Sequence, residues 1–306
     1  MRRRFAVGLC AVLVLAAADV RVHAAPEPGG VLSRIRSTGR LTLGYRADAR
    51  PFSYTDDAGK PAGYSVTLCQ RVADDAKRDL GLPALKVEWV PVAFEQRFRA
   101  LRTGEIDLLC GADTVTLARR AEADFSIPIF PGGIGAALRS DASARLREVL
   151  SGGGQPFQPV WRANATQLLR SRDFTVVEGT TAQAWLGKRM NDLDVLAGVA
   201  PVKSYNDGIQ RVLDRRSDVF FGDRAILLAS ASRHSGANDL VVLDRLFTQE
   251  PLALALAPGD DQFRLLVDRA LSRLYRSADF AAMYTKTFGE PDQTTLTFFR
   301  WNALPE

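Results

Sequence analysis

Short apolar segments alternate with segments of helical periodicity along this chain, and that alternation limits its possible folds more than any other feature. Leu41–Tyr45, Leu85–Val90 and Ile106–Cys110 have the length and composition of buried strands. Between the first two, Val66–Leu80 places apolar residues at helical spacing. Strands that alternate with helices favour a parallel sheet with helices on its faces, so the pattern predicts an α/β fold.

The same alternation resumes after residues 151–165, which are rich in glycine and proline and are typical of a surface insertion. The second run carries strand patterns at 174–177, 218–223, 240–243 and 252–257, and helical patterns at 207–216, 225–232 and 263–274. About 280 residues would remain after removal of an export signal, which exceeds one usual hydrophobic core. We therefore expect two lobes.

Residues 1–24 have the composition of a secretory signal peptide. Three arginines precede an apolar run that is too short for a membrane span, and Val22–Ala24 resembles a cleavage site. Cleavage would lower the net charge from +5 to +2, because four arginines and one aspartate are lost. We expect a periplasmic protein, and we do not expect a nucleic-acid partner because no basic run with interleaved aromatic residues is present.

Two cysteines, Cys69 and Cys110, remain after the predicted cleavage. In an oxidising compartment such a pair tends to form a disulfide, although two buried thiols would also fit the pattern. His234 is then the only histidine, which excludes a histidine-rich zinc site. We predict no metal and no cofactor.

Polar side chains gather where the predicted strands end. Thr114 and Arg119 follow one strand, Thr180 and Thr181 follow another, and Asp223 ends a third. Ligands of open α/β sheets lie beyond the carboxyl ends of strands. Helix-start N–H groups with an arginine suit a carboxylate, and a lone aspartate suits an ammonium group, so together they describe an α-amino acid. Each residue alone could instead be a surface charge or a helix cap.

Several motifs occur in an order that resembles the family 3 extracellular solute-binding proteins, which are amino-acid receptors of ABC importers. Each motif is weak alone, but the ordered set spans about residues 31–306. The subgroup that it resembles most is the glutamate/aspartate-binding type. The matching segments are Gly44-Tyr45-Arg46, Pro51-Phe52-Ser53-Tyr54, Gly63-Tyr64-Ser65, Gln96-Arg97, Ile106 to Gly111, Arg119 with Phe125-Ser126, Glu178 to Thr181, Asp218 to Asp223 and Thr297-Phe298-Phe299.

The resemblance implies a periplasmic-binding-protein-like fold of type II, in which two α/β lobes are joined by two crossing strands near residues 130–140 and 245–256. It places residues 31–136 and 249–306 in lobe 1. Residues 137–248, with the insertion near 151–165, would form lobe 2.

The resemblance also implies roles for single residues. It assigns the ligand α-carboxylate to Arg119, Thr114 and Thr181, beside Thr180, and the amine to Asp223. Arginines that match Arg46 and Arg97 hold a side-chain carboxylate in the acidic-ligand subgroup. This chain departs from that subgroup with Ala112, Asp113, Phe94 and Tyr205. We expect Asp113 to pair with an amine or with Arg119, or to repel a second carboxylate, and we include Tyr205 in the binding site.

The resulting expectation is a monomeric receptor that closes around a polar, acidic L-amino acid and delivers it to an ABC importer permease. No bond would be made or broken. Two alternatives use the same scaffold: a periplasmic cyclohexadienyl dehydratase-like enzyme, with Asp113 as the candidate acid, and a ligand-sensing receptor.

Overall fold

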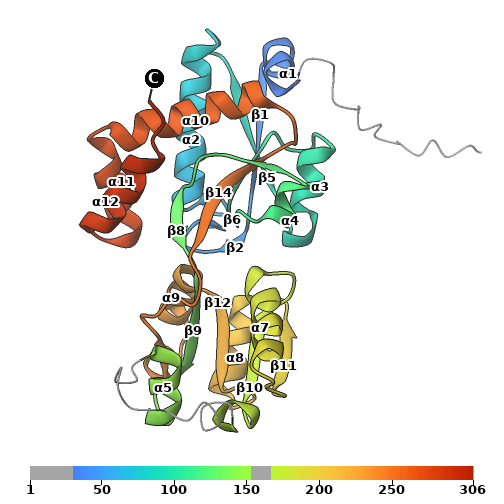
Figure 1. The fold of residues 1–306 in the computed structure, drawn as a ribbon. Helices are drawn as coiled ribbons and strands as arrows, with labels where there is room; N and C mark the ends of the chain where they lie inside the picture. Colours follow the sequence, from blue (N-terminus) through green and yellow to red (C-terminus); the bar gives the residue numbers. More distant parts are fainter. Residues whose placement is uncertain (1–29, 153–166, 306) are drawn as a thin grey trace, which may run out of the picture.

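A computed structural model describes residues 30–152 and 167–305 and shows two α/β lobes (Figure 1). Each lobe contains its own mixed sheet with helices packed on it, so the predicted fold class is confirmed. We define lobe 1 as the lobe that contains β1 and lobe 2 as the one that contains β10. The predicted signal peptide and most of the predicted insertion lie outside the described residues. The predicted lobe boundaries remain a proposal.

The sheet of lobe 1 has the strand order β5-β1-β6-β14-β7, and β8 pairs with β14. β1 is parallel to β5 and β6, whereas β14 is antiparallel to its neighbours. The strands are β1 (Arg40–Tyr45), β5 (Lys86–Pro91), β6 (Leu108–Thr114), β7 (Asp124–Phe125), β8 (Phe130–Gly132) and β14 (Glu250–Leu256). β6 continues through Thr114 because β14 pairs with Asp113 and Thr114, so the strand extends beyond Cys110, where the predicted strand ends.

Helices and a small three-stranded sheet complete lobe 1. They are α1 (Gly30–Thr38), α2 (Tyr64–Asp79), η1 (Phe94–Gln96), α3 (Arg97–Arg102), α4 (Leu117–Arg120), α10 (Asp261–Arg276), α11 (Asp279–Phe288) and α12 (Gln293–Asn302), with β2 (Asp48–Ala49), β3 (Ser53–Thr55) and β4 (Pro61–Ala62). No helix in the described parts of the chain has the length and apolarity that a membrane span requires.

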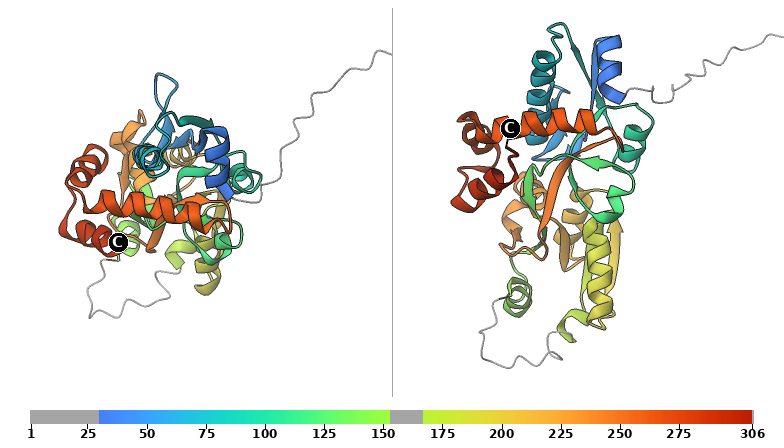
Figure 2. Two further views of the ribbon diagram at one scale, coloured as in Figure 1. Left: turned by 90° about the horizontal axis from the view of Figure 1, so that it is seen from above. Right: turned by 45° about the horizontal axis from the view of Figure 1, so that its top comes forward.

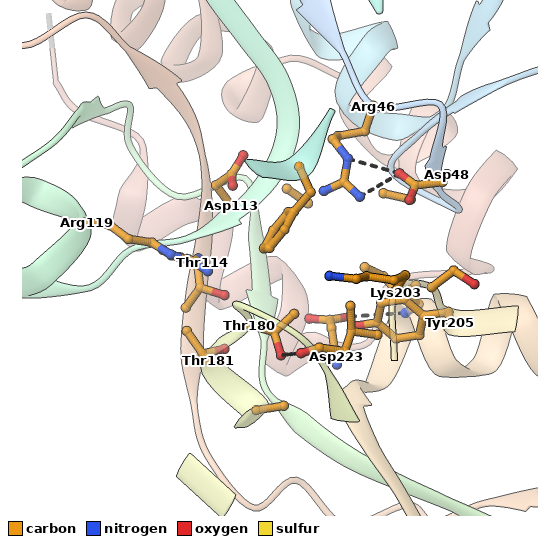
Figure 3. A pocket seen from close by; sticks show the side chains of 17 residues that line it. Arg46, Asp48, Asp113, Thr114, Arg119, Thr180, Thr181, Lys203, Tyr205 and Asp223 are labelled. Atoms are coloured by element: carbon orange, nitrogen blue, oxygen red, sulfur yellow. Dashed lines mark hydrogen bonds and ion pairs between the residues drawn. The ribbon is translucent and has the colours of Figure 1, made fainter. Parts of the chain in front are cut away.

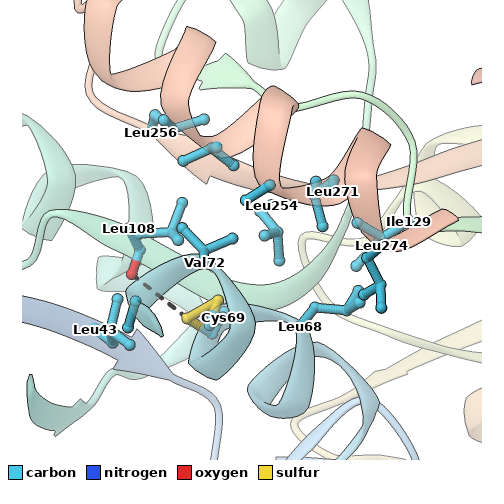
Figure 4. Packing of buried hydrophobic residues seen from close by; sticks show 14 of the residues in the cluster. Leu43, Leu68, Cys69, Val72, Leu108, Ile129, Leu254, Leu256, Leu271 and Leu274 are labelled. Carbon is cyan, nitrogen blue, oxygen red and sulfur yellow. Dashed lines mark hydrogen bonds between the residues drawn. A yellow bond between two sulfur atoms is a disulfide. The ribbon is translucent and has the colours of Figure 1, made fainter. Parts of the chain in front are cut away.

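The core of lobe 1 lies between α2, α10 and the sheet, as Figure 4 shows. Leu68 and Val72 of α2 meet Leu254 of β14 there, and all three side chains are fully buried. Each such burial stabilises the fold by about 1.5–3 kcal/mol. A disulfide joins Cys69 of α2 to Cys110 of β6 inside this core, so the cysteine pair forms a bridge.

Lobe 2 has the strand order β11-β10-β12-β9-β13. β10 is parallel to β11 and β12, and β9 is antiparallel to β12 and β13. Its elements are β9 (Ile134–Arg139), α5 (Ala144–Ser151), β10 (Asp173–Val177), α7 (Thr181–Asp192), β11 (Gly198–Val202), α8 (Tyr205–Leu213), β12 (Val219–Asp223), α9 (Arg224–Arg233), η2 (Ala237–Asp239) and β13 (Leu240–Val242). The sequence patterns predict β10 and β12 but not β11.

The chain crosses between the lobes twice, once from β8 to β9 and once from β13 to β14 (Figures 1 and 2). The two crossing segments are hydrogen-bonded to each other, because Phe247 N donates to Ile134 O at 2.8 Å and Ile134 N donates to Thr248 Oγ1 at 3.0 Å. Two adjacent, hydrogen-bonded strands of this kind form a hinge about which the lobes can rotate.

Candidate functional site

A pocket lies between the two lobes, and both lobes contribute to its lining (Figure 3). Lobe 1 contributes Arg46, Asp48, Ala49, Phe94, Ala112, Asp113, Thr114 and Arg119. Lobe 2 contributes Val177, Thr180, Thr181, Ala182, Lys203, Ser204, Tyr205, Asp223 and Ile226. The pocket therefore contains every predicted ligand-binding residue except Arg97.

The topology explains why these residues meet. Thr114 is the last residue of β6, and Asp223 is the last residue of β12, so each lies at the carboxyl end of a central strand. Thr181 is the first residue of α7, which follows β10. Because the carboxyl ends of the parallel strands in each lobe face the other lobe, the strand-end residues of both lobes line one cavity.

Arg119 is a half-buried cation without an ion-pair partner among the described residues. Its Nη1 atom donates to the carbonyl oxygen of Thr114 at 3.0 Å. Burial lowers the pKa of Arg119, and the nearby carboxylate of Asp113 acts in the opposite direction. A guanidinium held away from water is stabilised by an anion, so Arg119 gives this side of the pocket an anion-binding group.

Asp223 is the corresponding anion of lobe 2, and it also has no ion-pair partner in the described part of the chain. Its Oδ1 atom accepts from Ile226 N at 3.1 Å, so it caps α9 as well as lining the pocket. Burial raises the pKa of Asp223 to about 7, although its hydrogen bonds to backbone N–H groups favour the ionised form. A positively charged ligand group would therefore stabilise the ionised carboxylate.

Tyr205 fixes the position of Asp223, because Asp223 N donates to the Tyr205 hydroxyl at 3.0 Å. Burial raises the pKa of Tyr205, so the phenol keeps its proton and can donate it to a ligand. Packing on Gly222 supports this position, since a Cβ at residue 222 would lie 2.8 Å from the Tyr205 ring.

The first turn of α7 adds backbone donors. Thr180 caps the helix, and its hydroxyl donates to Val177 O at 2.6 Å, so this hydroxyl is already engaged. Thr181 Oγ1 donates to Glu250 Oε2 at 2.8 Å, and Glu250 belongs to the second crossing segment. Backbone N–H groups at the start of a helix can bind an anion, so α7 offers such groups to a ligand.

Arg97 lies behind the pocket rather than in it, which differs from the expectation that it holds a ligand carboxylate. Its Nε atom is 2.7 Å from Asp113 Oδ1, and the side chains are only 8% and 6% exposed. The guanidinium also donates to Phe94 O. Asp113 neutralises Arg97, so Asp113 pairs with this arginine and not with Arg119.

Arg46 does line the pocket, and it forms an ion pair with Asp48 at 2.5 Å. Asp48 is 56% exposed, and such exposed pairs contribute about 0–1 kcal/mol. The Phe94 ring is close to both arginines, with its centroid 4.8 Å from Arg46 Cζ and 3.8 Å from Arg97 Cζ.

Lys203 and Glu250 are charged residues of the site that the sequence patterns did not single out. Lys203 follows β11 and forms an ion pair with Glu178, which raises the pKa of Lys203. The rule that polar residues follow strand ends would have found Lys203 if β11 had been recognised. The charge of Glu250 raises the pKa of Asp223, an electrostatic effect between residues far apart in the sequence that no local pattern could reveal. In the described parts of the chain, no group of His, Cys, Asp and Glu is arranged to hold a metal ion.

Known proteins resemble this chain in sequence and in fold. The profile of the bacterial extracellular solute-binding proteins, family 3, matches residues 41–290. The chain is 28% identical over 289 residues to the L-glutamate/L-aspartate-binding protein of Pseudomonas aeruginosa, covering 94% of this chain and 89% of that protein. It is 24% identical over 289 residues to the glutamate/aspartate import solute-binding protein of Escherichia coli, with the same two shares covered.

Among solved structures, the fold is similar to an ancestral amino acid-binding protein, AncCDT-1, described as a precursor of cyclohexadienyl dehydratase. The TM-score is 0.67 at 23% sequence identity, covering 85% of this chain and 99% of that one. At this identity the likeness concerns the fold alone.

Proposed function

Because this chain belongs to the bacterial extracellular solute-binding proteins, family 3, we propose that it is an exported receptor for a polar L-amino acid that delivers its ligand to an ABC importer. One observation carries the proposal. Arg119 of lobe 1 and Asp223 of lobe 2 line the same pocket, and neither has an ion-pair partner among the described residues. Two opposite, unpaired charges on facing walls match the two charges of an α-amino acid.

In the proposed complex, Arg119 grips the ligand α-carboxylate with two parallel hydrogen bonds. Thr114 and the N-terminus of α7, with Thr181 as its first residue, supply further donors. The α-ammonium lies on Asp223. A micromolar site needs about −8 kcal/mol of binding free energy, which a few charge-assisted hydrogen bonds supply after ordering costs.

Ligand binding would shift the receptor toward a closed form. The ligand contacts both lobes at once, so it binds more tightly when the hinge segments have brought the lobes together. Closure also excludes water, which strengthens the ion pairs at both ends of the ligand. The closed receptor would then dock on a membrane permease and release the amino acid there.

Some observations support a ligand with an acidic side chain, and another supports a neutral side chain. The names of the two curated relatives support an acidic amino acid, as does Arg46 in the pocket lining. The ion pair between Arg97 and Asp113 supports a neutral one, because it removes one of the two expected cations.

A thermal-shift screen of the mature protein against the proteinogenic amino acids and small dicarboxylates tests the proposal. We expect a rise in Tm with at least one amino acid, and we expect Arg119→Ala to abolish it. Arg120→Ala is the matched control, because Arg120 is the next residue of α4 and is exposed. Loss of the shift in both variants, or no shift with any amino acid, would refute the proposed function.

A second candidate function is a dehydratase that acts on cyclohexadienyl acids. The observation in its favour is the raised pKa of Asp223, about 7, because a carboxyl group of this kind can donate a proton to a leaving hydroxyl group. Incubation with prephenate or arogenate would reveal turnover, and its absence would remove this candidate.

A further inference from the structure

We propose that the Arg97–Asp113 pair makes this receptor select an amino acid with a side-chain carboxamide over its carboxylate counterpart. The inference rests on the proposed function and specifies the side-chain end of the same pocket. We expected two arginines, Arg46 and Arg97, to face a ligand carboxylate. At this end of the pocket the lining instead contains one arginine, Arg46, and one aspartate, Asp113.

Arg97 is held firmly in its pair with Asp113. Both side chains are buried, at 8% and 6% exposure, and the Nε–Oδ1 distance is 2.7 Å. Aromatic rings flank the guanidinium, with the centroids of Phe94 and Phe98 at 3.8 Å and 4.2 Å from Cζ. Turning Arg97 toward a ligand would break a buried ion pair and leave Asp113 as an uncompensated buried charge, which is strongly unfavourable.

Among the described residues that line the pocket, one cation and one anion lack a partner of opposite charge. Of its cations, Lys203 is paired with Glu178 and Arg46 with Asp48, while Arg119 is unpaired. Of its anions, only Asp223 has no cationic partner within the described residues. The α-carboxylate and the α-ammonium use both unpaired charges.

A carboxamide needs one hydrogen-bond donor and one acceptor, and Arg46 and Asp113, which both line the pocket, carry such groups. The Oδ2 atom of Asp113 is buried and has no hydrogen-bond partner within the described chain. The position that a Cβ would occupy at Gly111 lies 2.8 Å from this oxygen and 3.8 Å from Arg46 Cγ, so the Asp113 carboxylate and the aliphatic part of the Arg46 side chain lie near the same point of β6.

Arg46 can therefore donate to the amide oxygen of a ligand while Asp113 accepts from its amide nitrogen. A carboxylate in the same place would bring one oxygen to Arg46 and the other toward the like charge of Asp113. Unpaired buried acceptors and like charges reject a ligand more strongly than a missing contact does.

Calorimetric titration of the mature protein with L-glutamine, L-glutamate, L-asparagine and L-aspartate tests this inference. We expect the amide that binds best to have a Kd at least tenfold below that of its acid counterpart. In Asp113→Asn we expect this ratio to fall at least tenfold, because the repelling charge is gone and Arg97 loses its counter-ion. Asp57→Asn removes one exposed carboxylate from lobe 1 and should leave the ratio unchanged.

The outcomes separate the two proposals. If no amino acid binds, the proposed function itself fails. If amino acids bind but glutamate or aspartate binds as tightly as its amide, only the carboxamide preference is overturned. An equal change of the ratio in Asp113→Asn and Asp57→Asn would also overturn it, since net charge alone would then set the preference. Should Asp113→Asn not fold, the wild-type titrations still decide.

Discussion

Asp223→Asn, combined with a pH series, tests the electrostatic basis of the proposed site. The pKa of Asp223 rises from its ordinary value near 3.8 to about 7 because the carboxylate is buried. That difference corresponds to about 4 kcal/mol of cost for the ionised carboxylate in the empty receptor. Since the folded-state pKa of Asp223 is the higher one, burial of this carboxyl group has no cost to folding below about pH 4, where the group is protonated in both states. The free energy of unfolding then falls as the pH rises through 7 and the buried group ionises.

A ligand ammonium binds the ionised form and reverses this cost, so affinity should rise with pH. With a pKa of about 7 in the empty site, the apparent Kd at pH 5 should be about 100-fold higher than at pH 8. Titration calorimetry in buffers of different ionisation enthalpy should detect release of nearly one proton per ligand at pH 6 and almost none at pH 8.

In Asp223→Asn, we expect weaker binding at pH 8 and a flat Kd between pH 5 and 8. Asp214→Asn is the control, because Asp214 is an exposed carboxylate at the end of α8 and should leave the wild-type pH profile intact. A wild-type Kd that does not change between pH 5 and 8, with no linked proton, would refute the assignment of Asp223 to the ammonium.

Three further perturbations test other parts of the structure. Cys69→Ser opens a disulfide that spans 41 residues, and denaturant unfolding should show a loss of about 4 kcal/mol, whereas a loss below about 1 kcal/mol would contradict the chain-entropy account. Gly179→Ala adds a Cβ at φ 72° in the turn before α7 and should destabilise the protein by about 1 kcal/mol. Gly187→Ala lies inside α7, where a Cβ meets open space, and should stabilise the protein by about as much. Chemical denaturation that gives both changes the same sign would refute this. Glu250→Gln removes a negative charge that raises the pKa of Asp223, so the pH midpoint of ligand binding should move to lower pH, and an unchanged midpoint by calorimetry would exclude this coupling.

The sequence predicted those parts of the fold whose pattern is strong and local. β10 and β12 are nearly continuous apolar runs, as expected for strands covered on both faces. The positions where these strands end predicted Thr181 and Asp223 as site residues. The sequence patterns did not predict β11, because this strand is largely exposed and contains Gly198 and Pro201, and glycine and proline are depleted in strands.

Pairing between charged residues was the part of the site that the sequence could not reveal. Arg46 and Arg97 were both expected to face a ligand carboxylate, but each finds a protein carboxylate first. Arg97 and Asp113 are 16 residues apart, on α3 and β6, and only the packing of these two elements brings them together. A pattern of residue types places a charge near a site but does not show whether that charge is already neutralised.

The bridge between Cys69 and Cys110 has a consequence for how the protein must be produced. Neither cysteine is exposed at all in the folded lobe, so dissolved oxidants and reductants cannot reach the sulfurs once the surrounding core has closed. Oxidation must therefore precede the final packing of α2 against β6. A preparation folded in a reducing cytosol would keep two trapped thiols, so mass spectrometry of the purified protein would reveal the compartment in which it had folded.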